Sequence, residues 1–303
     1  MKRVISLLLL SALLSFAGCG DNSGENAHSR VDKYSEESLA AYTVESGNNA
    51  KFTYDVYLQD GKPEFVWVTG PVSEEETHYE FPSHLDGVPI TGIAANAFSY
   101  APIMKLTFPG ELEYIGQGAF YNCPALTAVS IPPSVEKVED YAFYSCVMLE
   151  SVSIPDSLAM IGGLAFQDTP WLEKQIDEFV IVGDHVLIHA NVTGEVTVPR
   201  DVRYISSAFY RNEQITAVTL PQGLMEIGPA SFMGCTALTN IQLPDSIVRI
   251  GASAFRMCSS LTALTLPESV AEIGVYAFDG LGGEVTAPAG SRAAKLLADR
   301  DGE

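Results

Sequence analysis

Phenylalanine recurs at a fixed interval through most of the chain, and this repeat limits the possible folds more than any other feature. Between residues 98 and 278, eight phenylalanines follow Ala or Ser, and the steps between them are 22, 23, 23, 43, 23, 23 and 23 residues. They are Phe98, Phe120, Phe143, Phe166, Phe209, Phe232, Phe255 and Phe278. A unit this short cannot enclose its own apolar side chains. The repeat therefore predicts coils that bury their apolar residues by stacking on one another.

The stretch that begins at Leu126 shows how one coil is built. Apolar residues alternate up to Ile131, which predicts a short strand with one face toward the core. Pro132 ends that strand because proline offers no N–H to a ladder. A second short apolar arm follows at 135–138, and in most copies this arm ends in Ile-Gly, where we expect glycine to supply a corner that strains other residues. Parallel pairing between coils predicts a mainly β solenoid of about eight coils with short helical or turn segments.

The repeat pattern L-x-x-V-x-I-P-x-S-V-x-x-I-G-x-x-A-F-x-x-C resembles that of the BspA-like leucine-rich repeat family of bacterial surface proteins. The resemblance extends from about Phe81 to Pro288. It implies a leucine-rich-repeat solenoid with parallel strands. It also implies a cell-surface or secreted protein, because members of the family are described as such. Some members are adhesins that bind host matrix proteins. The expected partner is therefore a protein, either a host matrix protein or a surface protein of a neighbouring cell, although the repeat itself predicts only a scaffold. The alternatives are a glycan-binding surface lipoprotein and a structural coat protein without a defined ligand.

The start of the chain predicts export. A basic start precedes the apolar run 4–14, which is shorter than the roughly 20 residues that a membrane-spanning helix needs. The small residues directly before Cys19 resemble the lipobox of bacterial lipoproteins, which implies that residues 1–18 are a signal peptide and that Cys19 carries a lipid. The alternative is ordinary secretory cleavage near Ala17. The lipoprotein interpretation predicts a protein on the bacterial cell surface, held at the membrane only by its lipid.

Composition divides the rest of the chain into four segments. Residues 19–50 are polar and are expected to be a flexible acidic tether, because they cannot bury enough apolar surface to offset the entropy of ordering. Residues 51–80 alternate in strand fashion around an Asp-Gly pair and predict a β-hairpin that caps the first coil. Residues 81–290 are the repeat region. Residues 291–303 predict a C-terminal cap with a short helix.

The charge of the chain argues against nucleic acid as a partner. The formal net charge is −21 at pH 7. A field of this sign repels a phosphate backbone. It equally disfavours attachment of the protein face to an anionic lipid surface.

The 43-residue step contains an insert at 173–194. Apolar residues on both sides of Gly183 and Asp184 predict a β-hairpin there. Two interpretations remain open: the insert is a binding face, as insertions in solenoids often are, or it is a structural seam between two stacks of four repeats. The binding-face interpretation predicts that the stack does not need this strand pair. Under that interpretation, the candidate ligand-binding residues are Trp171, Phe179, His185 and His189.

A second set of candidates is aromatic. The position after the repeat phenylalanine holds Tyr121, Tyr144 and Tyr210. If exposed, neighbouring rings in this column would form a ladder with about 5 Å between coils. Tyrosine is an efficient binding residue because it offers a large area at low entropic cost. The alternative is that these rings cover the ends of the core.

The sequence offers little that is typical of catalysis or of a cofactor. Residues 134–137 match the S-x-x-K nucleophile motif, but they lie in the repeat turn without the accompanying S-D-N or K-T-G, so the match is due to chance. The sequence contains no G-x-S-x-G, no phosphate-binding loop and no H-E-x-x-H, so we expect neither an enzyme nor a bound cofactor or metal. His185 and His189 lie in a strand-like stretch, where they would be roughly 13 Å apart and too distant for one ion. Four cysteines share one column of the repeat and are expected to be buried free thiols, with disulfides or a metal site as the alternatives. They are Cys123, Cys146, Cys235 and Cys258.

Overall fold

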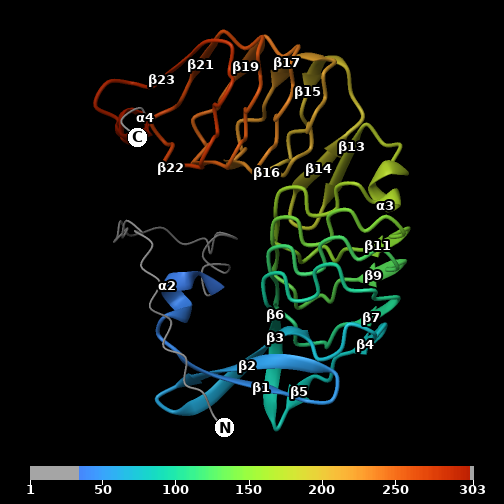
Figure 1. The fold of residues 1–303 in the computed structure, drawn as a ribbon. Coiled ribbons are helices and arrows are strands. Elements are labelled where there is room, and N and C mark those ends of the chain that lie inside the picture. The colour runs from blue at the N-terminus through green and yellow to red at the C-terminus, as the bar shows by residue number, and fades with distance from the viewer. Residues whose placement is uncertain (1–33, 301–303) are drawn as a thin grey trace.

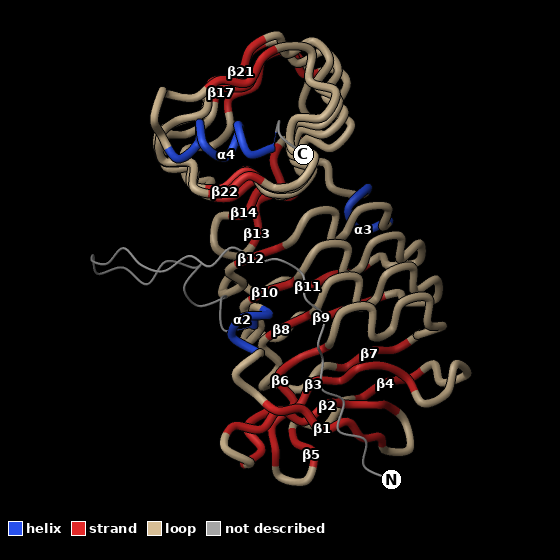
Figure 2. Tube along the Cα trace, turned by 60° about the vertical axis from the view of Figure 1, so that its left-hand side comes forward, coloured by secondary structure: helices blue, strands red, loops and turns tan. Residues whose placement is uncertain are grey.

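The computed structural model describes residues 34–300, which form two stacks of coils that meet at a bend (Figure 1). Each regular coil has a short outer strand and a short inner strand joined by turns (Figure 2). The outer strands are β4 (His78–Glu80), β7 (Lys105–Thr107), β9 (Ala128–Ser130), β11 (Ser151–Ser153), β15 (Gly194–Thr197), β17 (Ile215–Thr219), β19 (Asn240–Gln242), β21 (Ala263–Thr265) and β23 (Glu284–Thr286). The inner strands are β6 (Val88–Ile93), β8 (Tyr114–Ile115), β10 (Lys137–Val138), β12 (Met160–Ile161), β16 (Tyr204–Ile205), β18 (Glu226–Ile227), β20 (Arg249–Ile250) and β22 (Glu272–Ile273). The inner strands line the concave side of the bend (Figure 1).

Parallel pairing of the inner strands confirms the predicted mainly β solenoid. Across residues 34–300 there are about ten turns rather than the eight predicted. The two additional rungs are β3 (Lys62–Pro71) and β14 (Val186–Ala190), each of which is the second strand of a hairpin. β3 pairs in parallel with β6, and β14 pairs in parallel with β16. Each stack of four phenylalanine coils therefore begins with a hairpin.

The repeat phenylalanines fill the core in two separate columns. Phe143 is fully buried and stacks on Phe120 at 5.2 Å and on Phe166 at 5.3 Å between ring centroids. The second column starts at Phe209 and stacks in the same way as far as Phe278. The buried residues of the two stacks likewise form two clusters. The break in the column coincides with the 43-residue step in the sequence.

The glycine of the inner arm is needed for close approach between coils, not for an unusual backbone conformation. A Cβ added at Gly251 would lie 2.4 Å from the backbone nitrogen of Pro229, and one at Gly274 would lie 2.3 Å from that of Ala252. Neither glycine has a positive φ. The prediction that glycine supplies a strained corner is therefore wrong. Glycine is required because the backbone of the preceding coil leaves no room for a Cβ.

The N-terminal cap is larger than the sequence suggests. β2 (Phe52–Gln59) and β3 form the predicted hairpin, with positive φ angles at Asp60 and Gly61 in its turn. A further strand, β1 (Thr43–Asn48), pairs antiparallel with β2 and follows the short helix α2 (Glu36–Leu39). The tether predicted for 19–50 thus extends too far, because the polar residues of β1 lie on an exposed edge strand and resemble a linker in composition. Residues 19–33 lie outside the described part.

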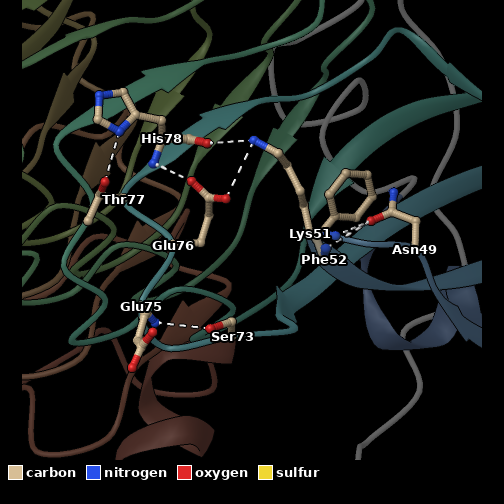
Figure 3. Close-up of polar contacts among 8 residues, drawn as sticks. All are labelled: Asn49, Lys51, Phe52, Ser73, Glu75, Glu76, Thr77 and His78. Carbon is tan, nitrogen blue, oxygen red and sulfur yellow. Dashed lines mark hydrogen bonds and ion pairs between the residues drawn. The ribbon is translucent and has the colours of Figure 1, made fainter.

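Polar contacts fasten this cap to the first outer strand (Figure 3). The ammonium of Lys51 lies 3.5 Å from the carboxylate of Glu76 and donates to the backbone carbonyl of His78 at 3.2 Å. The backbone N–H of His78 donates to the Glu76 carboxylate at 2.9 Å. This N–H and the Lys51 charge lower the pKa of Glu76. Asn49 accepts hydrogen bonds from the backbone N–H groups of Lys51 and Phe52, which fixes the turn that brings Lys51 to Glu76.

The insert is a structural seam. Its hairpin consists of β13 (Phe179–Val182) and β14, and β14 continues the inner sheet of the second stack. Val186 of β14 is buried in the first core, whereas the next residue, Leu187, is buried in the second. This pairing and burial favour the seam over the interpretation of the insert as a strand pair that the stack does not need. The sequence pattern predicts the hairpin, but it carries no information about the two cores on either side.

The two stacks touch at a closely packed joint beside the hairpin. The Ser207 hydroxyl accepts from the backbone N–H of Leu164 at 2.8 Å, and the Ser206 hydroxyl donates to the Gly162 carbonyl at 2.9 Å. A Cβ added at Gly163 would lie 2.7 Å from the Cβ of Pro229. Glycine at this position therefore allows the first stack to approach the second.

The C-terminal end is closed by α4 (Arg292–Arg300), which lies where the sequence predicts a helix. Ala293 is fully buried, and Leu297 packs against the second core. The helix thus covers apolar residues that the last coil would otherwise expose.

Candidate functional site: a tyrosine ladder on the turns

Four tyrosines form a row on the turns that lead from inner to outer strands of the first stack. Tyr121 and Tyr144 stack at 5.3 Å with an angle of 9° between their planes. Tyr100 packs edge-on against Tyr121 at 5.5 Å, and Tyr141 packs edge-on against Tyr144 at 5.7 Å. We refer to Tyr100, Tyr121, Tyr141 and Tyr144 as the tyrosine ladder. The predicted proximity of Tyr121 and Tyr144 is thus confirmed.

The backbone of the solenoid sets the spacing of the ladder. The N–H of Tyr100 donates to the carbonyl of Tyr121 at 2.8 Å, and the N–H of Asn122 donates to the carbonyl of Tyr144 at 2.7 Å. These bonds hold successive turns about one strand spacing apart, so rings in one column must stack. Tyr100 and Tyr141 have positive φ angles, which turn them outward. Sequence reasoning missed Tyr100 because it is two residues after its phenylalanine instead of one.

The ladder is partly exposed. Tyr100 is 65% exposed and Tyr141 is 37% exposed, while Tyr121 and Tyr144 are half-buried. The first stack also exposes the large apolar side chains of Met104, Val147 and Met148. Exposed apolar groups gathered in this way are typical of interaction surfaces.

Two phenols of the ladder have raised pKa values. Burial raises the pKa of Tyr144 to about 12, with a contribution from the nearby Asp168 carboxylate. Burial also raises the pKa of Tyr141, and Asp140 adds to this effect. These two hydroxyls therefore remain hydrogen-bond donors to a bound partner.

Tyr210, the third predicted member of the column, belongs to the second stack. The Arg211 guanidinium lies over its ring at 5.0 Å from the centroid. Among the described residues, no ring contact joins Tyr210 to the ladder, which belongs to the first stack.

The four candidates in and beside the insert do not form one site. Trp171 is half-buried in α3 (Pro170–Glu173) and packs edge-on against Phe166 at 5.2 Å. Phe179 packs on the second core. His185 lies in the hairpin turn rather than in a strand, 3.8 Å from the Asp201 carboxylate. His189 contacts Asn191 at 3.1 Å. Their role in binding stays a prediction.

The four repeat cysteines are free, buried thiols. Each sulfur donates to the carbonyl of the phenylalanine in the preceding coil, for example from Cys146 to Phe120 at 3.1 Å and from Cys258 to Phe232 at 3.1 Å. Burial raises the pKa of Cys258 to about 12. A thiol held in this way packs as a small apolar residue and is a poor nucleophile.

A small cavity of about 80 Å³ lies at the concave side of the joint, and paired charges line it. Lys137 and Glu139 form an ion pair at 2.5 Å, and Arg249 lies 3.7 Å from Glu226. Asp140 accepts a hydrogen bond from the N–H of Gly163 at 2.6 Å, and burial raises the pKa of its carboxyl to about 6. Acids and bases of both stacks therefore line this cavity.

Comparison with known proteins identifies the repeat. Residues 91–207 and 180–282, more than half of the chain, match the family described as BspA type leucine rich repeat region, in six copies. No curated protein matches the chain. Within residues 34–300, no helix has the length and apolar character needed to cross a membrane.

Several solved structures are similar to this chain at low sequence identity. The pneumococcal vaccine antigen PcpA is 17% identical over 80% of this chain and 81% of its own, with a TM-score of 0.42. A leucine rich cell surface protein from Faecalibacterium prausnitzii is 18% identical over 83% and 96%, with a TM-score of 0.34. The T. pallidum leucine rich repeat protein is 20% identical over 85% and 96%, with a TM-score of 0.29.

Proposed function

Because the chain belongs to the BspA-type leucine-rich repeat family, we propose that it is an adhesin-like cell-surface protein that binds another protein and catalyses no reaction. The observation that supports this proposal is the tyrosine ladder with its exposed apolar neighbours. Large aromatic side chains dominate the energy of protein interfaces. The solenoid holds these rings on rigid turns, so little entropy is lost when a partner orders them.

Alanine variants of the ladder test this function. The double variant Tyr121→Ala/Tyr144→Ala is expected to bind a panel of host matrix proteins and neighbouring-cell surface proteins at least tenfold more weakly than the wild type, or about 1.4 kcal/mol. Tyr276→Ala is the matched control, since Tyr276 is 58% exposed on the second stack and outside the ladder. Equal loss in the control, or no binding by the wild type to any protein of the panel, would contradict the proposal.

Glycan binding is the second candidate, and the stacked, nearly parallel rings of Tyr121 and Tyr144 favour it. Aromatic rings repeated at coil spacing provide apolar surface against which the sugar rings of an extended chain can pack. A glycan array probed with the wild type and the double variant separates the two functions. Ladder-dependent binding to glycans but not to proteins would favour this candidate.

We propose that the protein is held at the bacterial surface by a lipid on Cys19, which lies outside the described residues. One lipid-bearing residue supplies the attachment, so Cys19→Ala is expected to release the protein from membranes or to leave its signal peptide uncleaved. Metabolic labelling with a fatty-acid analogue measures this. A wild-type protein that takes up no label would show that the lipobox interpretation is wrong.

A further inference from the structure

A short N-terminal segment lies across the concave sheet at the cap end of the first stack. We refer to residues 34–42, which include α2, as the strap (Figure 1). The Tyr34 ring contacts Tyr114 at 5.3 Å and Trp67 at 5.6 Å between centroids. At the other end of the strap, Tyr42 packs edge-on against Phe65 at 5.1 Å. Two tyrosines therefore connect the strap to the sheet.

The surface under the strap is a set of four aromatic side chains, Tyr57, Phe65, Trp67 and Tyr114, which we refer to as the platform. Trp67 and Tyr114 stack at 4.9 Å with 12° between their planes, although β6 lies between their strands. The intervening residue is Gly92, where an added Cβ would lie 2.3 Å from the Trp67 indole nitrogen. Glycine at this rung lets the indole lie flat, so the platform depends on a particular residue in each of the three strands.

Hydrogen-bonding groups surround the platform. The Tyr34 hydroxyl donates to the carboxylate of Glu113. The Tyr114 hydroxyl donates to Glu139 at 3.1 Å. The indole N–H of Trp67 is buried and has no hydrogen-bond partner among the described residues. Buried donors without acceptors are rare in folded proteins and call for a specific explanation.

The strap covers the platform without becoming part of the core. Trp67 is 6% exposed and Tyr114 is 9% exposed, whereas no strap residue of described exposure is buried. The backbone hydrogen bonds of the strap join its own residues, from Leu39 to Ser35 at 2.9 Å and from Tyr42 to Leu39 at 3.0 Å. Tyr34 and Tyr42 thus supply ring contacts that the aromatic side chains of a competing segment can replace.

We infer that the platform is a binding site for a tyrosine-bearing segment of a partner protein, and that the strap is its built-in competitor. Tyr34 shows the chemistry that the site accepts: an aromatic ring against Trp67 and Tyr114, with a hydroxyl that donates to Glu113. A phenylalanine lacks the donor, and a sulfated or phosphorylated tyrosine brings a negative charge toward the Glu113 carboxylate. The site therefore selects unmodified tyrosine.

The intact strap competes at the high effective concentration of a tethered ligand, which reaches the millimolar range for short linkers. Removing its two rings must therefore strengthen binding in trans. The platform lies on β2, β3 and β8, whereas the tyrosine ladder lies on the turns. This site is thus independent of the proposed adhesin function.

The test uses the full chain with Trp171→Phe, which leaves Trp67 as its one tryptophan. The probe is a synthetic peptide of residues 34–42, titrated against this chain and against the same chain with Tyr34→Ala/Tyr42→Ala while Trp67 fluorescence is recorded. We expect at least tenfold tighter binding to the strap variant. We expect at least tenfold weaker binding to that variant by a peptide with phenylalanine at both tyrosine positions, and by one with sulfated tyrosines.

Several results would overturn the inference. A strap variant that loses its circular dichroism spectrum would make the strap an integral part of the fold. A folded strap variant that does not bind the peptide, or that binds the tyrosine and phenylalanine peptides equally, would exclude tyrosine recognition. A concentration-dependent dimer of the wild-type chain that Tyr34→Ala abolishes would assign the platform to a second copy of this chain.

Discussion

Individual side chains in this protein owe their role to the coil above or below them. Phe143 has a ring partner on each side, whereas Phe278 contacts Phe255 at 6.2 Å and is only partly buried. The cysteine thiols and the glycines of the inner arm likewise act on the preceding coil. In a stack of this kind, the cost of a substitution depends on its distance from the ends.

Phe143→Ala is expected to lower the free energy of unfolding by about 3–5 kcal/mol through the cavity that it leaves. Phe278→Ala is expected to cost less and mainly to loosen the last coil, because its ring packs against a coil on one side. Urea titrations followed by circular dichroism measure both. Equal losses at the two positions would contradict the nearest-neighbour description.

Asp140 makes stability depend on pH in the weakly acidic range. Burial raises the pKa of its carboxyl to about 6 in the folded protein, above the ordinary value near 4. Its contribution to stability is therefore present at low pH and is lost as the pH rises through about 6. Asp140→Asn is expected to add about 2 kcal/mol at pH 7.5 and to flatten the profile between pH 4 and 6.

Thermal unfolding at a series of pH values measures this effect. The control is Asp245→Asn, which changes an exposed carboxyl in a turn of the second stack. A profile for Asp140→Asn that is parallel to the wild type would show that the Asp140 carboxyl does not cause the dependence.

At the scale of elements, the two hairpins have equivalent roles. β3 and β14 are each the antiparallel partner of the preceding strand and the parallel partner of the first repeat strand. A parallel stack that begins without such a strand exposes the edge of its sheet and its core. The insert therefore covers the start of the second stack in the same way as the N-terminal cap covers the start of the first.

Leu187→Ala in β14 tests this equivalence. Leu187 is fully buried in the second core, so its truncation is expected to cost about 2–5 kcal/mol and to raise hydrogen exchange in β16, its parallel neighbour. Ile176→Ala is the control, since Ile176 is 91% exposed and should change stability by less than about 0.5 kcal/mol. Similarly small effects at both positions would mean that the insert is a surface hairpin that the second stack does not need.

The sequence was sufficient for features that repeat and insufficient for features that occur once. Tyr121 and Tyr144 could be placed side by side because the 23-residue period determines the contact. The role of β14 could not be predicted, since its pairing with β16 depends on where the two cores meet. The strap was also missed, because Tyr34 and Tyr42 are two aromatic residues in a polar stretch and their partners are more than 14 residues away in sequence. One-off, long-range contacts leave no period to detect.

At the scale of the whole molecule, the bend arises from the joint. The phenylalanine column ends at Phe166 and restarts at Phe209, so no continuous core keeps the two stacks in line. At the joint, the hydrogen bonds of Ser206 and Ser207 and the close contact at Gly163 join the two stacks. We expect these contacts to set the angle between the stacks.

Gly163→Ala tests whether this joint sets the shape. The added methyl group would lie 2.7 Å from Pro229 and 3.2 Å from the Ser207 hydroxyl, so the second stack must move away or the contact must be strained. Overpacking of this kind is expected to cost about 1–3 kcal/mol. Small-angle X-ray scattering should show a changed distribution of interatomic distances. Gly223→Ala is the matched control, because a Cβ there has no neighbour within 4 Å. Scattering and unfolding curves of Gly163→Ala that coincide with those of Gly223→Ala would mean that the bend is held elsewhere, in the β13–β14 hairpin.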